Sequence, residues 1–372
     1  MIYLDNAATT RPSNGALARA NTYLTDCYYN PYALYHGGVE AHRFLTQARS
    51  ALLSRIADPA AFELIFTSCG TEADNQAVFG AGRRGNVVTT AGEHAAVYES
   101  CKELKNRGVE PRFAPLHADG SVDVEALLSL VDDKTSLVSV IHVSNETGAV
   151  NDIAEIARRV KQKNARIVFH SDGVQAFGKL PVRLTKDIDL YTISAHKIGA
   201  LKGTGALIRR KAYTAQPAFV CGGGQENGLR SGTENVFGIA CFHFAAEEKF
   251  ASMKEDGVRL AEYKELLWSL LDHAQFTRLS PEGGSPYILT VSARGKRGET
   301  LQRMLWDRGV AVGTGSACNS KKPHSRVLEA CGYAPDVLDG VLRVSFCPQT
   351  TEEDVRLAAE AMNEAARAFG GV

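Results

Sequence analysis

Two charged side chains follow short apolar runs, at points where a strand would end. Lys197 comes soon after the run LYTIS at residues 190–194, and Asp172 follows an apolar run at residues 166–170. In open α/β sheets, ligands bind beyond the carboxyl ends of the strands. A lysine amine can bond covalently to an aldehyde, and an aspartate can keep a pyridine nitrogen protonated, so that the ring withdraws electrons. The pair therefore favours a pyridine-type cofactor. Taken singly, each residue also has an ordinary explanation, a solvated lysine or a helix-capping carboxylate.

A pattern suited to a phosphate group occurs at residues 62–75, FELIFTSCGTEADN. It predicts a strand, a tight turn and the start of a helix. Backbone N–H groups at such a helix start, together with the Thr71 hydroxyl, form an anion site. An ordinary helix cap provided by Ser68 or Thr71 would give the same pattern. This turn alone therefore leaves both interpretations open.

Further polar side chains fall at the ends of other predicted strands. His94 stands just before a predicted helix, Asn145 and Glu146 stand at a turn, and Gln175 follows the apolar run that leads to Asp172. The carboxyl ends of parallel strands meet at one edge of a sheet, where ligands bind. The convergence of five strand ends, rather than any single residue, predicts one ligand site.

The composition excludes several classes of function. The chain has 372 residues, with 42 Lys and Arg against 42 Asp and Glu, so no net basic charge points to nucleic acid or to an anionic membrane surface. The N-terminal segment lacks the basic start and apolar run of a signal peptide, and no run approaches the ~18 apolar residues of a membrane span. We therefore expect a cytoplasmic protein. The eight cysteines form no CxxC pair, which disfavours metal sites and predicts free thiols.

Short β-branched runs alternate with helical patterns, as in a mostly parallel sheet with crossover helices. The predicted strands of this part are residues 63–67, 86–90, 136–143, 166–170, 190–194 and 205–208. The predicted helices include residues 71–80, 153–163 and 236–253, and a helical pattern continues to about residue 273. Shorter strands follow at residues 287–291, 310–313 and 342–346. We predict an α/β fold with a large domain at residues 15–253 and a smaller α+β domain made of residues 1–14 and 254–372.

Nine segments, in order along nearly the whole chain, resemble the motifs of the cysteine desulfurases. The segments are YLDNAATT, TSCGTEADN, EHAAV, HVSNETG, HSDGVQAFGKLP, SAHKIGALKGTGAL, GGGQENGLRSGTEN, GSACNS and LRVSF. This family is the NifS/IscS-like branch of the class V aminotransferases, which use pyridoxal 5'-phosphate. The resemblance implies an aspartate-aminotransferase-like large domain, the fold type I of pyridoxal-phosphate enzymes.

The resemblance also implies a role for each matched residue around the cofactor. Lys197 would hold the cofactor covalently, Asp172 would pair with the ring nitrogen, and Gln175 would bond to the phenolic oxygen. His94 would stack on the ring and move protons. The residues that would hold the phosphate are Gly70, Thr71, Ser194, His196 and, reaching over from the neighbouring subunit, Thr233. A homodimer with shared active sites is therefore implied.

The substrate implied by the resemblance is L-cysteine. Asn145, which would also contact the cofactor, and Arg343 would orient the substrate carboxylate, a role that suits the two-pronged geometry of arginine. Cys318 would attack the substrate sulfur and carry it as a persulfide, with release of L-alanine.

Cys318 lies in a polar, Gly/Ser-rich segment, GTGSACNSKKPHS. This composition predicts an exposed and mobile segment, and a buried structural cysteine fits it poorly. Lys321, Lys322 and His324 are close in sequence and could stabilise a thiolate, the form that attacks. The GSAC motif resembles that of the desulfurase branch with the longer loop.

Two residues depart from the family pattern. Asn227 stands where the family commonly has arginine, and Cys69 replaces the usual glycine of the phosphate turn. The chain also ends without the longer tail that some members use to dock a scaffold protein. An iron–sulfur scaffold is therefore implied less securely as the sulfur acceptor, and tRNA thiolation and cofactor biosynthesis stay open as destinations of the sulfur.

Other functions compete with the desulfurase. A selenocysteine lyase acts on a substrate that differs by one atom, so the sequence does not separate the two. A transaminase needs no cysteine on the loop, and the GSAC motif therefore disfavours it. A non-catalytic protein with this fold would be expected to have lost Lys197, Asp172 or Cys318, and all three are present.

Overall fold

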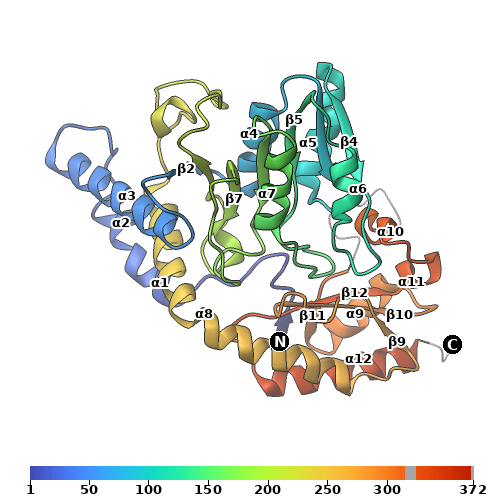
Figure 1. The fold of residues 1–372 in the computed structure, drawn as a ribbon. Helices are drawn as coiled ribbons and strands as arrows, with labels where there is room; N and C mark the ends of the chain where they lie inside the picture. The colour runs from blue at the N-terminus through green and yellow to red at the C-terminus, as the bar shows by residue number, and fades with distance from the viewer. Residues whose placement is uncertain (315–323, 370–372) are drawn as a thin grey trace.

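The computed structural model describes residues 1–314 and 324–369 (Figure 1), and Cys318, Lys321 and Lys322 lie outside the described residues. Seven strands form a central sheet in the order β2-β8-β7-β6-β5-β3-β4. Their bounds are β2 (Phe62–Thr67), β3 (Asn86–Thr90), β4 (Glu110–Ala114), β5 (Thr135–Ser139), β6 (Val168–Asp172), β7 (Leu190–Ser194) and β8 (Gly205–Arg210). Strands β3 to β7 pair in parallel, and only β8 runs antiparallel to its neighbours in this sheet. The predicted α/β class with a mostly parallel sheet is confirmed.

Helices cover both faces of the central sheet, because alternate strand residues point to opposite sides and both sides are apolar. Val87 and Leu137 pack with the two helices of one face, while their neighbours Val88 and Val138 belong to the larger core on the other. The helices of the first face are α4 (Gly70–Ala81) and α5 (Ala95–Leu104). The helices of the larger core are α1 (Asn14–Ala20), α3 (His36–Ser54), α6 (Val124–Ser129), α7 (Ile153–Lys163) and the first part of α8 (Val236–Leu270). The short helix α2 (Thr22–Thr25) follows α1.

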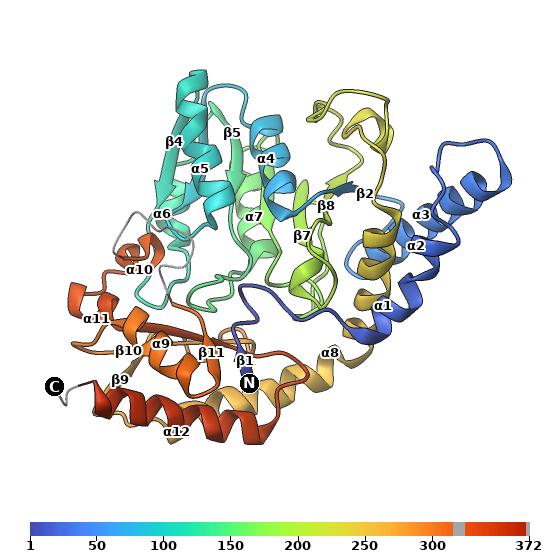
Figure 2. The ribbon, with the colours of Figure 1, turned by 180° about the vertical axis from the view of Figure 1, so that it is seen from behind.

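The C-terminal residues form a second unit with its own core, and the N-terminal strand belongs to it. Its strands are β1 (Ile2–Leu4), β9 (Phe276–Arg278), β10 (Ile288–Ala293), β11 (Val310–Val312) and β12 (Val341–Ser345), arranged as an antiparallel sheet β12-β10-β9 and a parallel pair β1-β11. Its helices are α9 (Gly298–Asp307), α10 (Arg326–Ala330), α11 (Pro335–Asp339) and α12 (Glu352–Ala368). Figure 2 shows β1 among the C-terminal elements and beside the central sheet.

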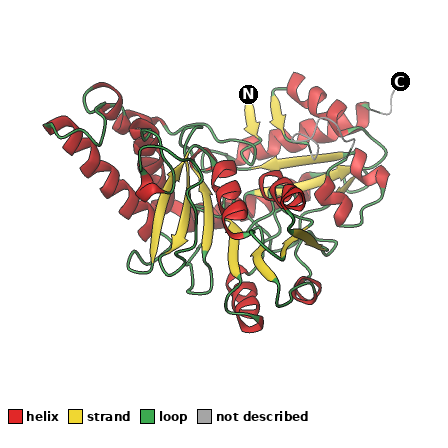
Figure 3. Cartoon of the chain, turned by 90° about the horizontal axis from the view of Figure 1, so that it is seen from above, coloured by secondary structure: helices red, strands yellow, loops and turns green. Residues whose placement is uncertain are grey.

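The long helix α8 runs from the central sheet to the C-terminal unit (Figures 1 and 3). Phe242 packs in the core of the central sheet, whereas Leu260 and Leu267 pack in the core of the C-terminal unit. The domain boundary expected after residue 253 falls inside this helix and stays a prediction. Among the described residues, no helix combines the length and the apolar character needed to cross a membrane.

Several predicted element bounds shift in the structure. The strand predicted at residues 166–170 is β6, which begins two residues later because Asn164 and Arg166 form a turn after α7 in which the Asn164 side chain accepts from the Arg166 N–H at 3.0 Å. Asp172 is therefore the last residue of the strand. The strand predicted at residues 136–143 ends as β5 at Ser139. Strand β4, which was not predicted, is an edge strand that tolerates Pro111.

Gly205 allows strand β8 to approach the turn before α4, and we predict that Gly205→Ala destabilises the protein. A Cβ at this position would lie 2.6 Å from the carbonyl carbon of Cys69 and 2.9 Å from the nitrogen of Gly70, both backbone atoms. The expected cost is about 1–3 kcal/mol of unfolding free energy, as for other overpacked sites. Urea unfolding would measure it.

Gly257→Ala is the matched control, because Gly257 lies inside α8, and a Cβ there would meet no atom within 4 Å beyond the backbone of its own helix. There alanine should stabilise the protein by about 0.5–1 kcal/mol, since it lowers the backbone entropy lost in a helix. Equal effects of the two substitutions would contradict the close approach at Gly205.

Candidate active site

Lys197 and Gln175 both reach the N-terminal segment. Lys197 ends the short 3-10 helix η2 (Ala195–Lys197) that follows β7, and its Nζ donates to the carbonyl oxygens of Ala7 at 2.7 Å and Ala8 at 2.8 Å. Gln175 Nε2 donates to the same Ala7 oxygen at 2.9 Å. The two side chains therefore come from different strand ends and meet at one backbone oxygen.

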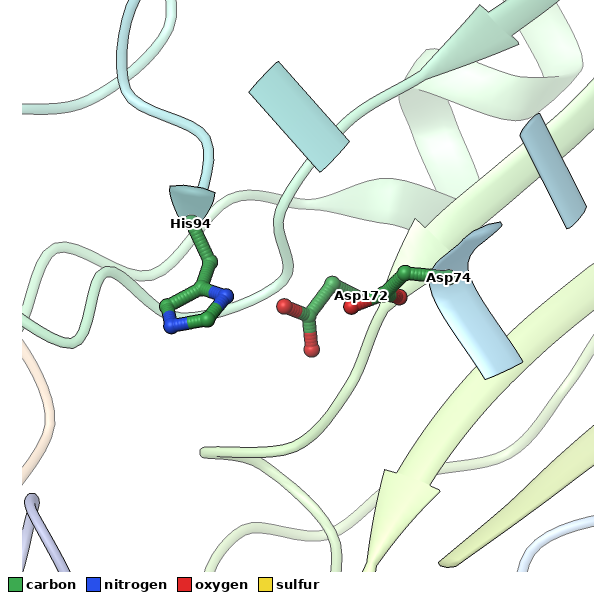
Figure 4. Close-up of side chains that lie close together, drawn as sticks. All are labelled: Asp74, His94 and Asp172. Carbon is green, nitrogen blue, oxygen red and sulfur yellow. The ribbon is translucent and has the colours of Figure 1, made fainter. Parts of the chain in front are cut away.

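Asp172 and His94 lie side by side, with a third group, Asp74, on the other side of Asp172 (Figure 4). One ligand-type atom from each of the three lies within 4.8 Å of the others. Asp172 ends β6, His94 caps α5 through its Nδ1, and Asp74 lies in the first half of α4. One strand of the sheet and two helices on one of its faces thus bring these groups together.

The burial of this cluster shifts its pKa values. Burial raises the pKa of Asp172, while His94, the N–H of Val174 and Lys197 oppose that shift. Burial lowers the pKa of His94, the charge of Asp172 opposes that shift, and Lys197 reinforces it. A buried carboxylate next to a lysine and a neutral imidazole can pair with a positively charged ring and exchange protons with a bound molecule.

The turn before α4 has the donors that an anion requires. The helix begins at Gly70 with Cys69 as N-cap, and no side chain of the described residues makes a capping hydrogen bond there. The alternative of a cap provided by Ser68 or Thr71 is therefore wrong; the N–H of Ser68 instead donates to the Glu72 carboxylate at 2.8 Å. Thr71 is exposed in the first turn.

Ser194 and His196 border the same turn. Ser194 is buried, and its hydroxyl oxygen finds no hydrogen-bond partner among the described residues. A Cβ on Gly70 would lie 3.4 Å from the Ser194 Cβ, so the hydroxyl is next to the helix start. His196 Nδ1 lies 3.1 Å from the Thr9 hydroxyl oxygen, and burial lowers its pKa to about 4. The ring is therefore neutral at physiological pH.

Arg343 enters the site from the C-terminal sheet. Its Nη2 donates to Asp5 at 2.8 Å and its Nη1 to the carbonyl oxygen of Asn145 at 2.8 Å. The residue is 7% exposed, and its Nε has no partner within the described part of the chain. The arginine is thus held in place by two of its five N–H groups, and its Nε–H is one of those left to bind a carboxylate.

The loop that carries Thr233 is tied to the phosphate turn. Arg230 Nε donates to Glu72 at 2.9 Å, and the buried Glu226 accepts two hydrogen bonds from Arg49. Thr233 itself is exposed just before α8. Asn227 has a left-handed backbone with φ 56°, a conformation that asparagine adopts more readily than most residues. This geometry gives a local reason for the departure from arginine.

The C-terminal unit also holds the turn that precedes His94. Arg326 in α10 donates to the carbonyl oxygens of Ala91 and Glu93, and its guanidinium lies 3.7 Å from the centre of the Tyr98 ring. Glu93 is fully buried, accepts from the Ile141 N–H at 2.8 Å, and has its pKa raised by burial to about 8.

The sequence assigned no role to several of these residues. Asp74 had a detectable signal, because it falls on the same helical face as the core residues Ala73, Ala77 and Val78, where a carboxylate is unexpected. Arg326 follows the polar segment of Cys318, and nothing in its spacing pointed to the turn before His94. Cys318 lies outside the described residues.

Comparisons with known proteins agree with this site. The aminotransferase class-V family model matches residues 2–357. A cysteine desulfurase of Nostoc sp. strain PCC 7120 is 36% identical, over 98% of this chain and 92% of its own. A solved NifS-like protein superposes with a TM-score of 0.91 at 33% identity, covering 98% of both chains. SspA in complex with cysteine has a TM-score of 0.82 at 28% identity, covering 94% of this chain and 100% of its own.

The chain therefore belongs to the class-V aminotransferase family and, within it, to the branch of the cysteine desulfurases. Enzymes of this family depend on pyridoxal phosphate.

The buried histidine His142 gives a pH-dependent prediction. Its Nδ1 lies 2.8 Å from the Tyr191 hydroxyl oxygen, and burial lowers its pKa to about 4. Between about pH 6.5 and pH 4 the imidazole of His142 is protonated in the unfolded chain but neutral in the folded protein. The residue therefore lowers the free energy of unfolding progressively as the pH falls through this window, and it has no effect above the window. Relative to wild type, His142→Asn should gain about 1.4 kcal/mol of unfolding free energy per pH unit in this window.

Urea unfolding at pH 7, 6 and 5 would measure the difference. His42→Asn, at an exposed position of α3, is the control and should follow the wild-type curve. Parallel curves for wild type and His142→Asn would show that His142 is protonated in the folded protein.

Proposed function

We propose that this chain is a pyridoxal-phosphate-dependent cysteine desulfurase that converts L-cysteine to L-alanine and holds the sulfur as a persulfide on Cys318. The observation that carries the proposal is the placement of Asp172 and Lys197 at the ends of the adjacent parallel strands β6 and β7. The relatedness to cysteine desulfurases along 98% of the chain supports the same reaction.

The residues of the site fit the cofactor. The unpartnered hydroxyl of Ser194 and the uncapped start of α4 at Gly70 and Thr71 suit a phosphate group, with His196 beside them and Thr233 contributed by a second subunit. Asp172 is a buried carboxylate suited to the ring nitrogen, and Gln175 suits the phenolic oxygen. When bound, the cofactor supplies an electron sink for the substrate carbon.

The side chains of this protein then bind the substrate and move its protons. Lys197 would hold the cofactor through its amine, and the same amine would serve as a base towards the substrate. His94 is neutral because burial lowers its pKa, so it can accept a proton at physiological pH. Arg343 would bind the substrate carboxylate through N–H groups that include its Nε–H, with Asn145 beside it.

Cys318 completes the reaction as a nucleophile. Its thiolate attacks the sulfur of the substrate, an S–S bond forms and the substrate C–S bond breaks. The electron pair of that bond stays with the carbon skeleton, which takes up a proton from Lys197 or His94 and leaves as L-alanine. The sum is one L-cysteine and one Cys318 thiol converted to one L-alanine and one Cys318 persulfide.

The proposal includes partners and a compartment. As the family resemblance implies, the protein would act as a homodimer in which Thr233, exposed in the single chain, serves the phosphate site of a second copy. A sulfur-acceptor protein, either an iron–sulfur scaffold or a protein of tRNA or cofactor thiolation, would take the persulfide sulfur. The proposed compartment is the cytoplasm, where cysteines such as the buried Cys101, Cys241 and Cys331 stay free.

Cys318→Ala tests the nucleophile. Purified wild type should be yellow, release L-alanine from L-cysteine and gain one sulfur on Cys318, as detected by mass spectrometry of the intact protein and its peptides. Cys318→Ala should keep the colour and the spectral change caused by L-cysteine, but it should form no persulfide, because the attacking thiolate is gone.

Cys221→Ala is the control, since Cys221 is the exposed cysteine among the seven described, and this variant should form the persulfide as wild type does. Sulfur release by Cys318→Ala at the wild-type rate would disprove the role of Cys318. A wild type that stays colourless with added pyridoxal phosphate would disprove the whole function.

Arg343→Lys tests the binding of the substrate carboxylate. Lysine keeps the charge but loses the planar fork, so the KM for L-cysteine should rise roughly 10- to 100-fold, corresponding to one charged hydrogen bond, while kcat changes less. Steady-state alanine release would measure both constants. Arg278→Lys is the control, because Arg278 lies in the same sheet and donates two hydrogen bonds to the Glu265 carboxylate. The same KM change in both variants would refute a direct contact.

A further inference from the structure

Asp74 is a buried carboxyl group for which the proposed reaction has no use. It is 1% exposed, and Asp172 lies between it and His94 (Figure 4). One oxygen of Asp74, one oxygen of Asp172 and one nitrogen of His94 lie within 4.8 Å of one another. Two carboxyl groups this close in a buried site do not both ionise, because their charges repel and neither is well solvated.

The groups around Asp74 provide few interactions that would stabilise a negative charge on its carboxyl group. Its Oδ1 has no hydrogen-bond partner in the described ranges, and the nearest ring nitrogen, His170 Nε2, is 3.6 Å away. His170 is fully buried and has its pKa lowered to about 3, so its ring carries no positive charge.

The titratable groups that face Asp74 disfavour its ionisation further. Burial is the largest influence and raises the pKa of Asp74 well above its usual value, the charge of Asp172 raises it more, and a hydrogen bond from Thr192 opposes these two influences. Cys101 on α5 is also close, and burial keeps it a neutral thiol by raising its pKa. No cation among these groups stabilises a charge on Asp74.

Asp172 has the partners that Asp74 lacks. Its Oδ1 accepts from the Val174 N–H at 2.9 Å, and the charge of Lys197 favours its charged form. A proton shared between the two carboxyl groups therefore prefers Asp74.

We propose that Asp74 is a neutral carboxylic acid that holds one proton beside Asp172 and so keeps Asp172 the charged member of the pair. The inference rests on the proposed function, in which Asp172 must be charged to pair with the cofactor ring nitrogen. Asp74 is then a positioning residue, since it acts on the ring through Asp172.

Infrared spectroscopy of the full chain tests where the proton is. A neutral carboxylic acid has a carbonyl stretch separate from the carboxylate bands, and wild type should show one such band from Asp74 at neutral pH. Asp74→Asn should lose this band, and Asp172→Asn should keep it. Glu93→Gln identifies the separate band of Glu93, whose pKa is raised to about 8. The exposed Asp307→Asn should leave all of these bands unchanged.

Cofactor binding gives a second readout. Asparagine has the shape and the neutrality of a protonated aspartate, so Asp74→Asn should bind pyridoxal phosphate within about 3-fold of wild type and with the same absorbance maximum. Asp172→Asn should bind it at least roughly 10-fold more weakly, because the ring nitrogen loses its charged partner. These factors are order-of-magnitude expectations for the loss of a charged hydrogen bond.

Urea unfolding of the protein without cofactor is a third readout, and it requires no Asp172 variant. Above about pH 4 Asp74 is ionised in the unfolded chain but protonated in the folded protein. Because of this group, the free energy of unfolding therefore falls as the pH rises from about 4 towards neutrality. Asp74→Asn removes this effect. The free energy of unfolding of the variant relative to wild type should therefore rise with pH over this range by about 1.4 kcal/mol per pH unit, the slope expected for one proton.

Three outcomes would overturn the inference. The band could disappear in Asp172→Asn and persist in Asp74→Asn, no band could be lost in either variant, or Asp74→Asn could bind the cofactor as weakly as Asp172→Asn. The infrared and unfolding results do not require catalysis. A wild type that shows the Asp74 band but never becomes yellow would disprove the desulfurase function and leave the proton on Asp74 intact.

Discussion

The carbonyl oxygen of Ala7 accepts hydrogen bonds from Lys197 at 2.7 Å and from Gln175 at 2.9 Å, and the N–H of the same residue donates to the Ser345 hydroxyl at 2.8 Å. One residue of the N-terminal segment thus contacts two strand ends of the central sheet and the last strand of the C-terminal sheet. Asp5 adds an ion pair to Arg343. The site exists where it does because this segment lies between the two sheets and fixes groups from both.

This arrangement buries the site, and burial determines its charges. A buried charge requires a partner: Arg343 pairs with Asp5, and Asp172 has the Val174 N–H together with Lys197. Groups without such partners are expected to be neutral instead. Burial raises the pKa of Glu93 and lowers those of His94 and His196.

The positions of Lys197 and Asp172 could be predicted from the sequence, because a strand end next to a polar residue leaves a local pattern. The hydrogen bonds that Lys197 and Gln175 donate to the carbonyl oxygen of Ala7 could not be predicted, because a backbone carbonyl has no sequence signature and its partners are far away along the chain. The N-cap Cys69 was also missed, because Ser68 and Thr71 are better capping residues and tertiary packing against Gly205 decides the turn. The burial of Asp74 depends in the same way on how α4 packs against β6 and β7.

The C-terminal unit supports the chemistry from two sides. Through Arg343 it reaches the carbonyl of Asn145, and through Arg326 it holds the carbonyls of Ala91 and Glu93, directly before His94. Both arginines donate to backbone carbonyl oxygens and so help to fix the position of these loops, and Arg343 also pairs with the Asp5 carboxylate. Helix α10, which begins at Arg326, follows the segment of Cys318 in the sequence. A change in the packing of α10 would therefore move the turn that positions His94, the proposed proton carrier.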